Sequence, residues 1–310
     1  MAEILYSETL AQRLRGKVVV MTGGAQGIGA ATVAQLHALG AHVFFGDWDV
    51  THGAKLEDDL RAKANPQGGS AHFRQLDVRD YSSQLALFDA AYRAHGQIDV
   101  AISCAAVKEP SGYFEPADLD LESVRKEPSA INDAMAINLT SVLHFTRLAL
   151  AHMKSSPAPA PPFTRSITLI SSIAGITEAP GLFAYGAAKH GVIGLMRALR
   201  PWAPVRYGVR VNAICPWATD TQLLSGVKGR WAAEKMPLNT PDDVARQIMQ
   251  SAADATLNGT AVFVTGGQGF DTEEGVDRCR PKWMGEENAA EFDKGQKILG
   301  LGGDWTSEEK

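Results

Sequence analysis

The sequence predicts an α/β fold, a single doubly wound parallel sheet of about seven strands with helices on both faces and a C-terminal extension. From Lys17 onward, short β-rich apolar runs alternate with longer helical patterns, as in parallel strands joined by crossover helices. The runs are apolar throughout, which is typical of strands that are buried on both faces. A hydrophobic share of 45% with 21% charged residues supplies enough apolar surface for a sizeable core.

Seven runs have the length and composition of buried strands. The predicted strands are Val18–Thr22, His42–Asp47, Ala71–Leu76, Val100–Ser103, Ile167–Ser171, Val209–Cys215 and Ala261–Thr265. Between them, apolar residues recur with helical periodicity. The predicted helices are Ala30–Leu39, Tyr81–His95, Ser129–Lys154, Tyr185–Arg200 and Pro241–Ala253. The last has a clear start, with Thr240 as N-cap, Pro241 in the first turn and Asp243 three residues after the cap.

These elements predict one domain over residues 16–270, preceded by an N-terminal extension (1–15) and followed by a C-terminal extension (271–310). The extension of 40 residues or so is too short to be a second domain. A Pro-rich stretch at 155–164 is expected to form a surface loop. Residues 217–236 follow the sixth strand and mix large apolar residues with Gly and Lys, so we expect either a lid over a substrate pocket or an amphipathic surface helix.

Composition excludes several classes of function. The net charge of −5 leaves no excess of positive charge for a phosphate backbone, so nucleic acid is not an expected partner. No signal-peptide core or stretch of about 20 apolar residues is evident, so we expect a cytoplasmic protein with no membrane partner. The 3 cysteines lack paired spacing and the His residues do not cluster, so we expect free thiols and no metal.

A glycine-rich turn follows the first strand and opens the first helix, in the run Thr22–Gly29 (TGGAQGIG). A Cβ at the glycine positions would block both the tight turn and the close approach of a ligand. A helix N-terminus presents unpaired N–H groups and a partial positive charge, which a pyrophosphate satisfies. The strand–turn–helix context therefore predicts a dinucleotide site in a Rossmann-type fold.

Asp47 closes the second strand, where a carboxylate accepts hydrogen bonds from the ribose hydroxyls of an adenosine. A 2′-phosphate would face this carboxylate as a like charge, at a cost of a few kcal/mol for an effective dielectric near 20. Neither Gln26 nor Trp48 offers a compensating positive charge. The sequence therefore predicts NAD (NADH) as cofactor. The alternative is that Asp47 is simply a polar residue at the end of a strand.

Tyr185 and Lys189 lie four residues apart on one face of a predicted helix. A free phenol has a pKa near 10, and a nearby ammonium lowers that pKa, so proton exchange near neutral pH becomes feasible. Ser172 ends the fifth strand, where a hydroxyl can donate to a substrate oxygen that gains charge. A Tyr-x-x-x-Lys pair alone is common by chance, and only its combination with the glycine turn, Asp47 and Ser172 predicts a catalytic site.

With these motifs the sequence resembles the short-chain dehydrogenase/reductase family over about Gly16–Gly267. The resemblance rests on TGGAQGIG, on LDV at Leu76, on INLTS around Asn138, on ISSIAG around Ser172, on YGAAK from Tyr185 and on VNAICP before Trp217. It extends to fungal NAD-dependent dehydrogenases of secondary metabolism that are related to 15-hydroxyprostaglandin dehydrogenase, of the 5′-hydroxyaverantin dehydrogenase type. The resemblance also implies that the protein forms a homodimer or a homotetramer.

The resemblance implies that Tyr185 is the general acid/base and that Lys189 lowers the pKa of Tyr185 and holds the nicotinamide ribose. Ser172 would orient the substrate carbonyl, and Asn138 would position a water that links Lys189 to a proton relay. Asp77 and Val78 would flank the adenine, and Thr219 and Thr221 the nicotinamide amide. The full expected cofactor set is Gly23, Gln26, Gly27, Ile28, Gly29, Asp47, Trp48, Asp77, Val78, Ala105, Tyr185, Lys189, Pro216, Thr219 and Thr221.

Two stretches depart from the pattern of the family. Ser103–Ala106 replaces the usual Asn-Asn-Ala-Gly, which removes amide hydrogen bonds and adds a methyl beside the cofactor. Pro216–Trp217 replaces Pro-Gly and places a large ring near the substrate side of the nicotinamide, where Trp217 is either a pocket wall or simple packing. His190 follows Lys189, but its position points it away from the Lys189 face, so we expect no catalytic role for it.

The segments expected to rim the site are mostly apolar and predict a hydrophobic or aromatic secondary alcohol or ketone as substrate. They contain Ile173, Ala174, Ile176, Leu182, Phe183, Trp217, Leu223 and Leu224. Ser172, Leu182, Tyr185 and Trp217 are the expected substrate contacts. The predicted function is NAD(H)-dependent interconversion of such an alcohol and its ketone. The alternatives are an NADPH-dependent ketoreductase and, from another class, a dinucleotide-binding protein with a non-redox role as cyclase, isomerase or sensor.

Overall fold

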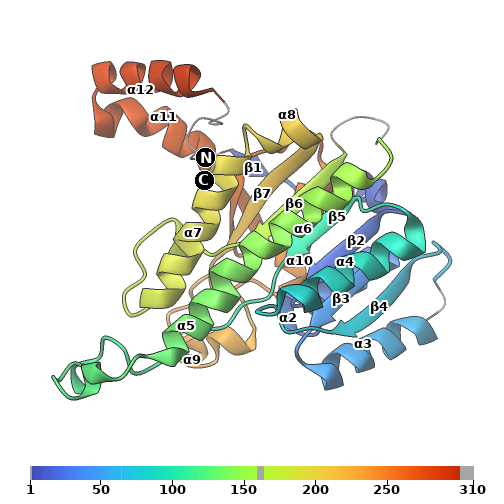
Figure 1. The fold of residues 1–310 in the computed structure, drawn as a ribbon, viewed down its shortest axis with the longest axis horizontal. Coiled ribbons are helices and arrows are strands. Elements are labelled where there is room, and N and C mark those ends of the chain that lie inside the picture. The colour runs from blue at the N-terminus through green and yellow to red at the C-terminus, as the bar shows by residue number, and fades with distance from the viewer. Residues whose placement is uncertain (1, 64, 159–163, 301–310) are drawn as a thin grey trace, which may run out of the picture.

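One sheet of nine strands runs through the molecule in the computed structural model, which describes residues 2–63, 65–158 and 164–300 (Figure 1). The spatial order of the strands is β1-β9-β8-β7-β6-β5-β2-β3-β4. The strands are β1 (Glu3–Ile4), β2 (Val18–Thr22), β3 (His42–Asp47), β4 (Ser70–Gln75), β5 (Val100–Ser103), β6 (Arg165–Ile170), β7 (Val209–Pro216), β8 (Ala261–Thr265) and β9 (Gln268–Asp271). All seven predicted strands are present, and strands β2 to β8 pair in parallel.

Two short strands at one edge exceed the predicted seven. β9 turns back from β8 through Gly266 and Gly267 and pairs with it antiparallel. β1 then pairs antiparallel with β9, where Glu3 faces Phe270. The N-terminal extension is thus joined to the sheet and covers an edge that would otherwise present unpaired backbone groups.

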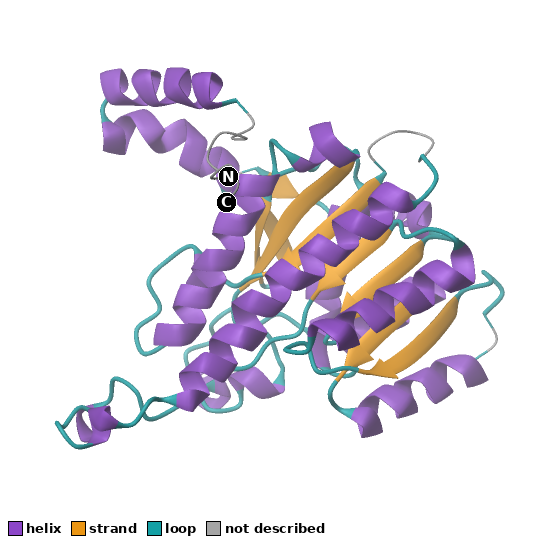
Figure 2. Cartoon of the chain, viewed as in Figure 1, coloured by secondary structure: helices purple, strands orange, loops and turns teal. Residues whose placement is uncertain are grey.

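Helices cover both faces of the sheet, as predicted (Figures 1 and 2). One core cluster lies between the sheet and helices α4, α6 and α7, with Phe88, Phe145 and Val192 fully buried. The other lies beneath α2 and α10 and contains Leu36 and Ile248. The helices are α1 (Glu8–Ala11), α2 (Gly27–Ala38), α3 (Val50–Ala62), α4 (Tyr81–His95), α5 (Ser129–Met135), α6 (Ser141–Ser155), α7 (Phe183–Leu199), α8 (Ala203–Tyr207), α9 (Lys228–Ala233), α10 (Pro241–Ala253), α11 (Glu273–Met284) and α12 (Glu286–Leu299).

The helix boundaries differ from the predicted ones mainly near the site. α2 begins within the glycine turn, at Gly27 rather than Ala30, and α7 begins two residues before Tyr185. The predicted helix Ser129–Lys154 is interrupted by a π-turn, η4 (Ala136–Thr140), which divides α5 from α6. Helix α10 has the predicted bounds, and its capping box of Thr240 and Asp243 is complete. Helix α3 was not predicted because it buries only Gly53 and Leu60 among many charged residues.

The stretch Ser129–Ser155 has the length and mean hydropathy of a membrane span among the described residues, at 27 residues and 1.2. Within the fold, 44% of its most apolar window is buried. Val142, Phe145 and Ala149 face the core that α4 also covers. Packing against the sheet therefore accounts for the apolar side of this helix.

The C-terminal extension forms a helical hairpin of α11 and α12 that projects from the body (Figure 1). Its base is held by Glu273, which is buried and accepts hydrogen bonds from Arg197 (2.8 and 2.9 Å) and Arg200 (3.0 Å) near the end of α7. Arg280 joins the two helices through Asp293 at 2.8 Å. Residues 301–310, and residues 159–163 of the Pro-rich stretch, lie outside the described part of the chain.

Residues 217–236 contain two short helical pieces, a 3₁₀ turn η6 (Gln222–Leu224) and helix α9. A second irregular segment, residues 108–128 between β5 and α5, extends away from the body and carries the 3₁₀ turns η2 (Pro116–Asp118) and η3 (Ser123–Arg125). We call residues 108–128 the arm. The arm and residues 217–236 both follow the carboxyl ends of strands, where the site lies.

Candidate active site

The carboxyl ends of four central strands meet at one level of the sheet. Thr22 of β2 pairs with Ser103 of β5, and Ser103 pairs with Leu169 of β6. Ile170, at the end of β6, pairs with Ile214 of β7. The segments that follow these strands therefore emerge side by side, as ligand-binding segments do in open α/β sheets.

Two glycines of the turn after β2 have no room for a side chain. Gly23 has a φ of +71°, and a Cβ there would lie 2.5 Å from the backbone nitrogen of Ala105. A Cβ at Gly29, in the first turn of α2, would lie 1.8 Å from the carbonyl oxygen of Gly23. These contacts pack the turn against the segment after β5 and bring the N-terminus of α2 close to it.

Asp47 organises the turn from the end of β3. Its Oδ2 accepts a hydrogen bond from the backbone N–H of Ala25 at 3.0 Å, and its Oδ1 accepts from the N–H of Asp49 at 3.1 Å. Each carboxylate oxygen has a second lone pair that can accept a ribose hydroxyl. Gln26 donates to Asp49 at 2.6 Å, and the Trp48 side chain is 79% exposed beside them.

An open groove of about 560 Å³ separates the glycine turn from residues 220–228. Lys228 forms an ion pair with Asp220 at 2.5 Å at the edge of this groove. The N–H groups at the start of α2 and the glycines without Cβ atoms suit a pyrophosphate. The residues present thus fit a dinucleotide. The groove is lined by Ala25, Gln26, Gly27, His52, Asp220, Thr221, Gln222, Ser225 and Lys228.

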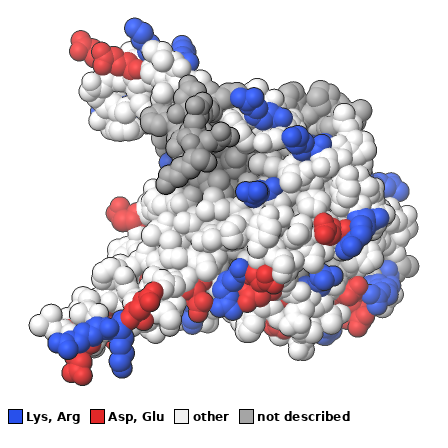
Figure 3. Space-filling view, viewed as in Figure 1, with Lys and Arg blue, Asp and Glu red and all other residues white. Residues whose placement is uncertain are grey.

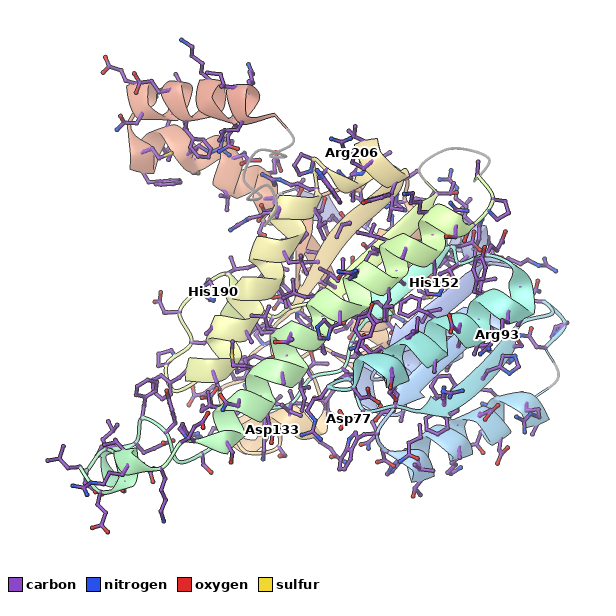
Figure 4. All side chains as sticks on the ribbon, in the orientation of Figure 1. Asp77, Arg93, Asp133, His152, His190 and Arg206 are labelled. Carbon is purple, nitrogen blue, oxygen red and sulfur yellow. The ribbon has the colours of Figure 1, made fainter. Side chains whose placement is uncertain are left out.

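Asp77 lies beyond the end of β4 and is engaged by a neighbouring cation. Arg79 donates to both Asp77 oxygens, at distances from 2.7 to 3.1 Å, and reaches Asp133 of α5 at 2.9 Å. These hydrogen bonds lower the pKa of Asp77. Figure 4 shows Asp77 and Asp133 at the same edge of the molecule. Val78 next to it is buried in the core cluster that α4 also covers.

Ser172 and Tyr185 form the polar pair of the site. Ser172 follows β6, is 9% exposed and caps the 3₁₀ turn η5 (Ile173–Gly175) by accepting from the N–H of Ala174 at 3.2 Å. Burial raises the pKa of Tyr185, and a hydrogen bond with the Ser172 side chain partly offsets this rise. The Ser172 hydroxyl is therefore close enough to the Tyr185 hydroxyl to act on its ionisation.

Lys189 is a buried cation, 1% exposed, one helical turn after Tyr185. Its Nζ donates to the carbonyl oxygen of Ile170 at 2.9 Å and lies 5.4 Å from the centroid of the Tyr185 ring. Burial lowers the pKa of Lys189 to about 8. At pH 7 the ammonium is therefore still mainly protonated and can stabilise a phenolate.

Cys104 lies in the stretch that departs from the family pattern. Burial raises the pKa of both Cys104 and Cys215 to about 12, so both thiols are neutral at physiological pH. All three cysteines of the chain are free. As neutral thiols, these two side chains act as small apolar groups near Lys189. They do not neutralise the positive charge of its ammonium.

Asn138 lies in the π-turn η4 and is fully buried. Its Oδ1 accepts from the N–H of Val107 at 2.9 Å, and its Nδ2 donates to the Val107 carbonyl at 3.0 Å. Two residues further on, Glu109 accepts from the N–H groups of Ala184 (3.1 Å) and Tyr185 (2.7 Å). Glu109 was not predicted, because nothing in the local sequence connects it to a helix 75 residues away.

Trp217 packs within the segment that follows β7. Its ring meets Trp231 of α9 edge to face at 5.0 Å and lies 6.2 Å from Phe263. Trp217 also donates its N–H to Val264 at 2.9 Å, which continues the sheet. Pro216 and Thr219 are buried next to it, and Thr221 faces Gly27 across the groove. Trp217 is half-buried, and its contact with Trp231 holds α9 at this end of the sheet.

Other predicted residues lie at the margin. Leu182 and Phe183 are 37% and 43% exposed at the start of α7, whereas Ala174 is buried. His190 is exposed on α7 (Figure 4), and its Nδ1 lies 2.9 Å from the Gly186 carbonyl of its own helix. Among the described residues no group of three or more His, Cys, Asp or Glu side chains could hold a metal ion.

Comparisons with known proteins agree with this geometry. The model of the short chain dehydrogenase family matches residues 17–230. The chain is 35% identical over 262 residues to cis-4-hydroxycyclohexanecarboxylate dehydrogenase of Sinomonas cyclohexanicum, covering 81% of this chain and 96% of that protein. It is 29% identical to 5′-hydroxyaverantin dehydrogenase of Dothistroma septosporum, covering 88% and 91%. The crystal structure of gox2181 superposes with a TM-score of 0.68 at 26% identity, covering 83% and 98%.

The fold and site define an oxidoreductase class that binds a nicotinamide dinucleotide. The chain belongs to the short-chain dehydrogenase/reductase family, and its relatives from fungal secondary metabolism agree with the resemblance seen in the sequence.

The contacts of Gly29 predict that Gly29→Ala strongly weakens cofactor binding. The methyl group would collide with the Gly23 carbonyl and displace the start of α2 from its ligand. NADH binding, followed by fluorescence, should weaken about 100-fold or more, the effect of losing one or two hydrogen bonds to a charged pyrophosphate. Gly194→Ala is the matched control, because its Cβ would meet nothing within 4 Å. Equal NADH affinity in the two variants would contradict this account of the turn.

Proposed function

We propose that this protein interconverts a hydrophobic or aromatic secondary alcohol and its ketone with NAD(H) as cofactor. The observation that carries the proposal is the buried Lys189 ammonium, 5.4 Å from the ring of Tyr185. The ammonium favours the phenolate of Tyr185 and opposes the burial that raises the pKa of this phenol, so that Tyr185 can exchange a proton with an alcohol oxygen. Ser172 supplies a second hydrogen bond to the same oxygen.

When bound, the dinucleotide supplies the hydride acceptor or donor of the reaction. In the oxidative direction Tyr185 accepts the hydroxyl proton of the substrate, and in the reductive direction it returns that proton to the carbonyl oxygen. Ser172 donates to the oxygen as negative charge develops on it. Lys189 stabilises the phenolate form of Tyr185 and is held in place by the Ile170 carbonyl at 2.9 Å. Through Val107, Asn138 anchors the segment beside this group.

We propose NAD rather than NADP because two carboxylates, Asp47 and Asp49, contact the glycine turn that borders the groove. Asp47 would accept the ribose hydroxyls, and Asp49 lies beside it. Of the two basic residues that line the groove, His52 is paired with Asp49 at 2.8 Å and Lys228 with Asp220 at 2.5 Å. A 2′-phosphate would face both carboxylates. The alternative of an NADPH-dependent ketoreductase requires Lys228 or His52 to leave its carboxylate partner.

The proposed substrate class follows from the mouth of the site. Apolar side chains are exposed on both of its sides, Leu182 and Phe183 at the start of α7 and Leu223 in η6. Relatives named as dehydrogenases of 5′-hydroxyaverantin, cis-4-hydroxycyclohexanecarboxylate and borneol support a cyclic or aromatic secondary alcohol. We propose a role in secondary metabolism on the same basis.

We also propose a cytoplasmic homodimer or homotetramer. Figure 3 shows a broad area with few charged side chains over α6 and α7. Leu143 of α6 is 45% exposed. A second copy of the chain would cover this surface at little cost in desolvated charge.

Replacing Tyr185 with Phe should lower kcat for alcohol oxidation at least about 100-fold, because the phenolic oxygen is the proposed proton acceptor. NADH formation, followed by absorbance with a panel of cyclic and aromatic secondary alcohols, measures the effect. Binding of NADH should stay within about twofold, since the ring is retained. An unchanged rate in Tyr185→Phe would favour the non-redox alternative.

The cofactor preference is tested by titrating the wild type and Asp47→Ser with NADH and NADPH. The wild type should bind NADH at least about 10-fold more tightly, because a 2′-phosphate would be repelled by Asp47. Asp47→Ser should narrow that ratio by weakening NADH binding and relieving the repulsion. Asp58→Ser, an exposed residue of α3, serves as control. Tighter binding of NADPH by the wild type would overturn the choice of NAD.

A further inference from the structure

The helix that carries Tyr185 and Lys189 lacks a cap of its own. Leu182 is the N-cap of α7 and its side chain makes no capping hydrogen bond. The first N–H groups of a helix have no partner within the helix, and a polar N-cap side chain usually satisfies one of them. Here that side chain is apolar, so the partner must come from elsewhere.

Glu109 provides this partner from the first residues of the arm. Its Oε1 accepts from the N–H of Ala184 at 3.1 Å and its Oε2 from the N–H of Tyr185 at 2.7 Å. Both oxygens are thus used, in a charge-assisted pair of hydrogen bonds at the positive end of the helix dipole. One of the two donors belongs to the proposed catalytic tyrosine itself.

Glu109 is in turn held close to the rest of the site. Asn138 binds both the N–H and the carbonyl of Val107, two residues before Glu109. Further along the arm, Phe114 meets Phe183 edge to face at 4.8 Å. The start of α7 is therefore attached to the arm by the Glu109 carboxylate and by an aromatic contact. Val107, which directly precedes the arm, is attached to the π-turn through Asn138.

We propose that Glu109 is a positioning residue, which holds the backbone of Tyr185 so that its hydroxyl meets Ser172 and the substrate oxygen. The proposal rests on the proposed function of Tyr185. A displacement of about 1 Å at a reacting group can cost up to about 100-fold in rate. Loss of the cap shifts the first turn of α7, whereas Lys189, four residues on, stays held by Ile170.

The test compares Glu109→Ala and Glu109→Gln with Glu122→Gln. Glu122 is an exposed residue of the same arm, so its variant removes one carboxylate charge without touching α7. Glu109→Ala should lower kcat about 10-fold or more, with KM for the alcohol and the Kd of NADH changed less than about threefold. Glu109→Gln should recover part of kcat, because its single amide oxygen can accept one of the two N–H groups. Glu122→Gln should behave as the wild type.

Amide hydrogen exchange gives a readout that does not depend on turnover. The peptide that begins α7 should exchange faster in both Glu109 variants and at the wild-type rate in Glu122→Gln. A kcat of Glu109→Ala within twofold of the wild type, or unchanged exchange at α7, would overturn the proposal. Equal loss of kcat in Glu122→Gln would also overturn it. A wild type without NAD(H)-dependent turnover would instead refute the proposed function, and the exchange rates would still decide whether Glu109 holds the helix.

Discussion

The proposed chemistry depends on one buried cation. The Lys189 ammonium is taken out of water, donates to a single strand-end carbonyl, and lies over the ring of Tyr185. Burial makes it a weaker base, with a pKa of about 8, yet leaves it mainly charged at pH 7. A positive charge at low dielectric acts strongly on its neighbours, and the neighbour whose charged state it favours is the phenolate of Tyr185. The nearby thiols of Cys104 and Cys215 remain protonated and do not neutralise it.

The parallel sheet is what brings the partners of this cation together. Because β2, β5, β6 and β7 end at the same level, the glycine turn, Cys104, Ser172 and Thr219 emerge along one edge although they are far apart in the sequence. Asp47 joins this edge from β3 through its hydrogen bond to Ala25. The helices then add orientation. α2 directs its N-terminus to the groove, and α7 places Tyr185 and Lys189 one turn apart, with Glu109 holding its first turn.

Features that are encoded locally could be predicted from the sequence. The apolar runs predicted every parallel strand, and Thr240 with Asp243 predicted the start of α10, because hydrophobic periodicity and caps act over a few residues. Features that depend on tertiary contacts could not be predicted. β1 and β9 are too short to show a pattern in the sequence. They form strands because β9 pairs with β8, and β1 then pairs with β9 at the edge of the sheet. Glu109 and Arg79 are ordinary charged residues in the sequence, and only the fold brings them to Tyr185 and Asp133.

The pH dependence of alcohol oxidation in the wild type and in Lys189→Met tests the central claim most directly. If Lys189 stabilises the phenolate of Tyr185, kcat/KM in the wild type rises with pH, because the proton acceptor is the ionised phenol. The rise should end as the pH passes the Lys189 pKa of about 8, because the stabilising charge is then lost. In Lys189→Met the tyrosine loses its cation, and the rising limb should move to higher pH by about one unit or more at saturating cofactor. A limb at the same pH in both proteins would contradict the account, since the ionisation that controls the reaction would then be independent of Lys189.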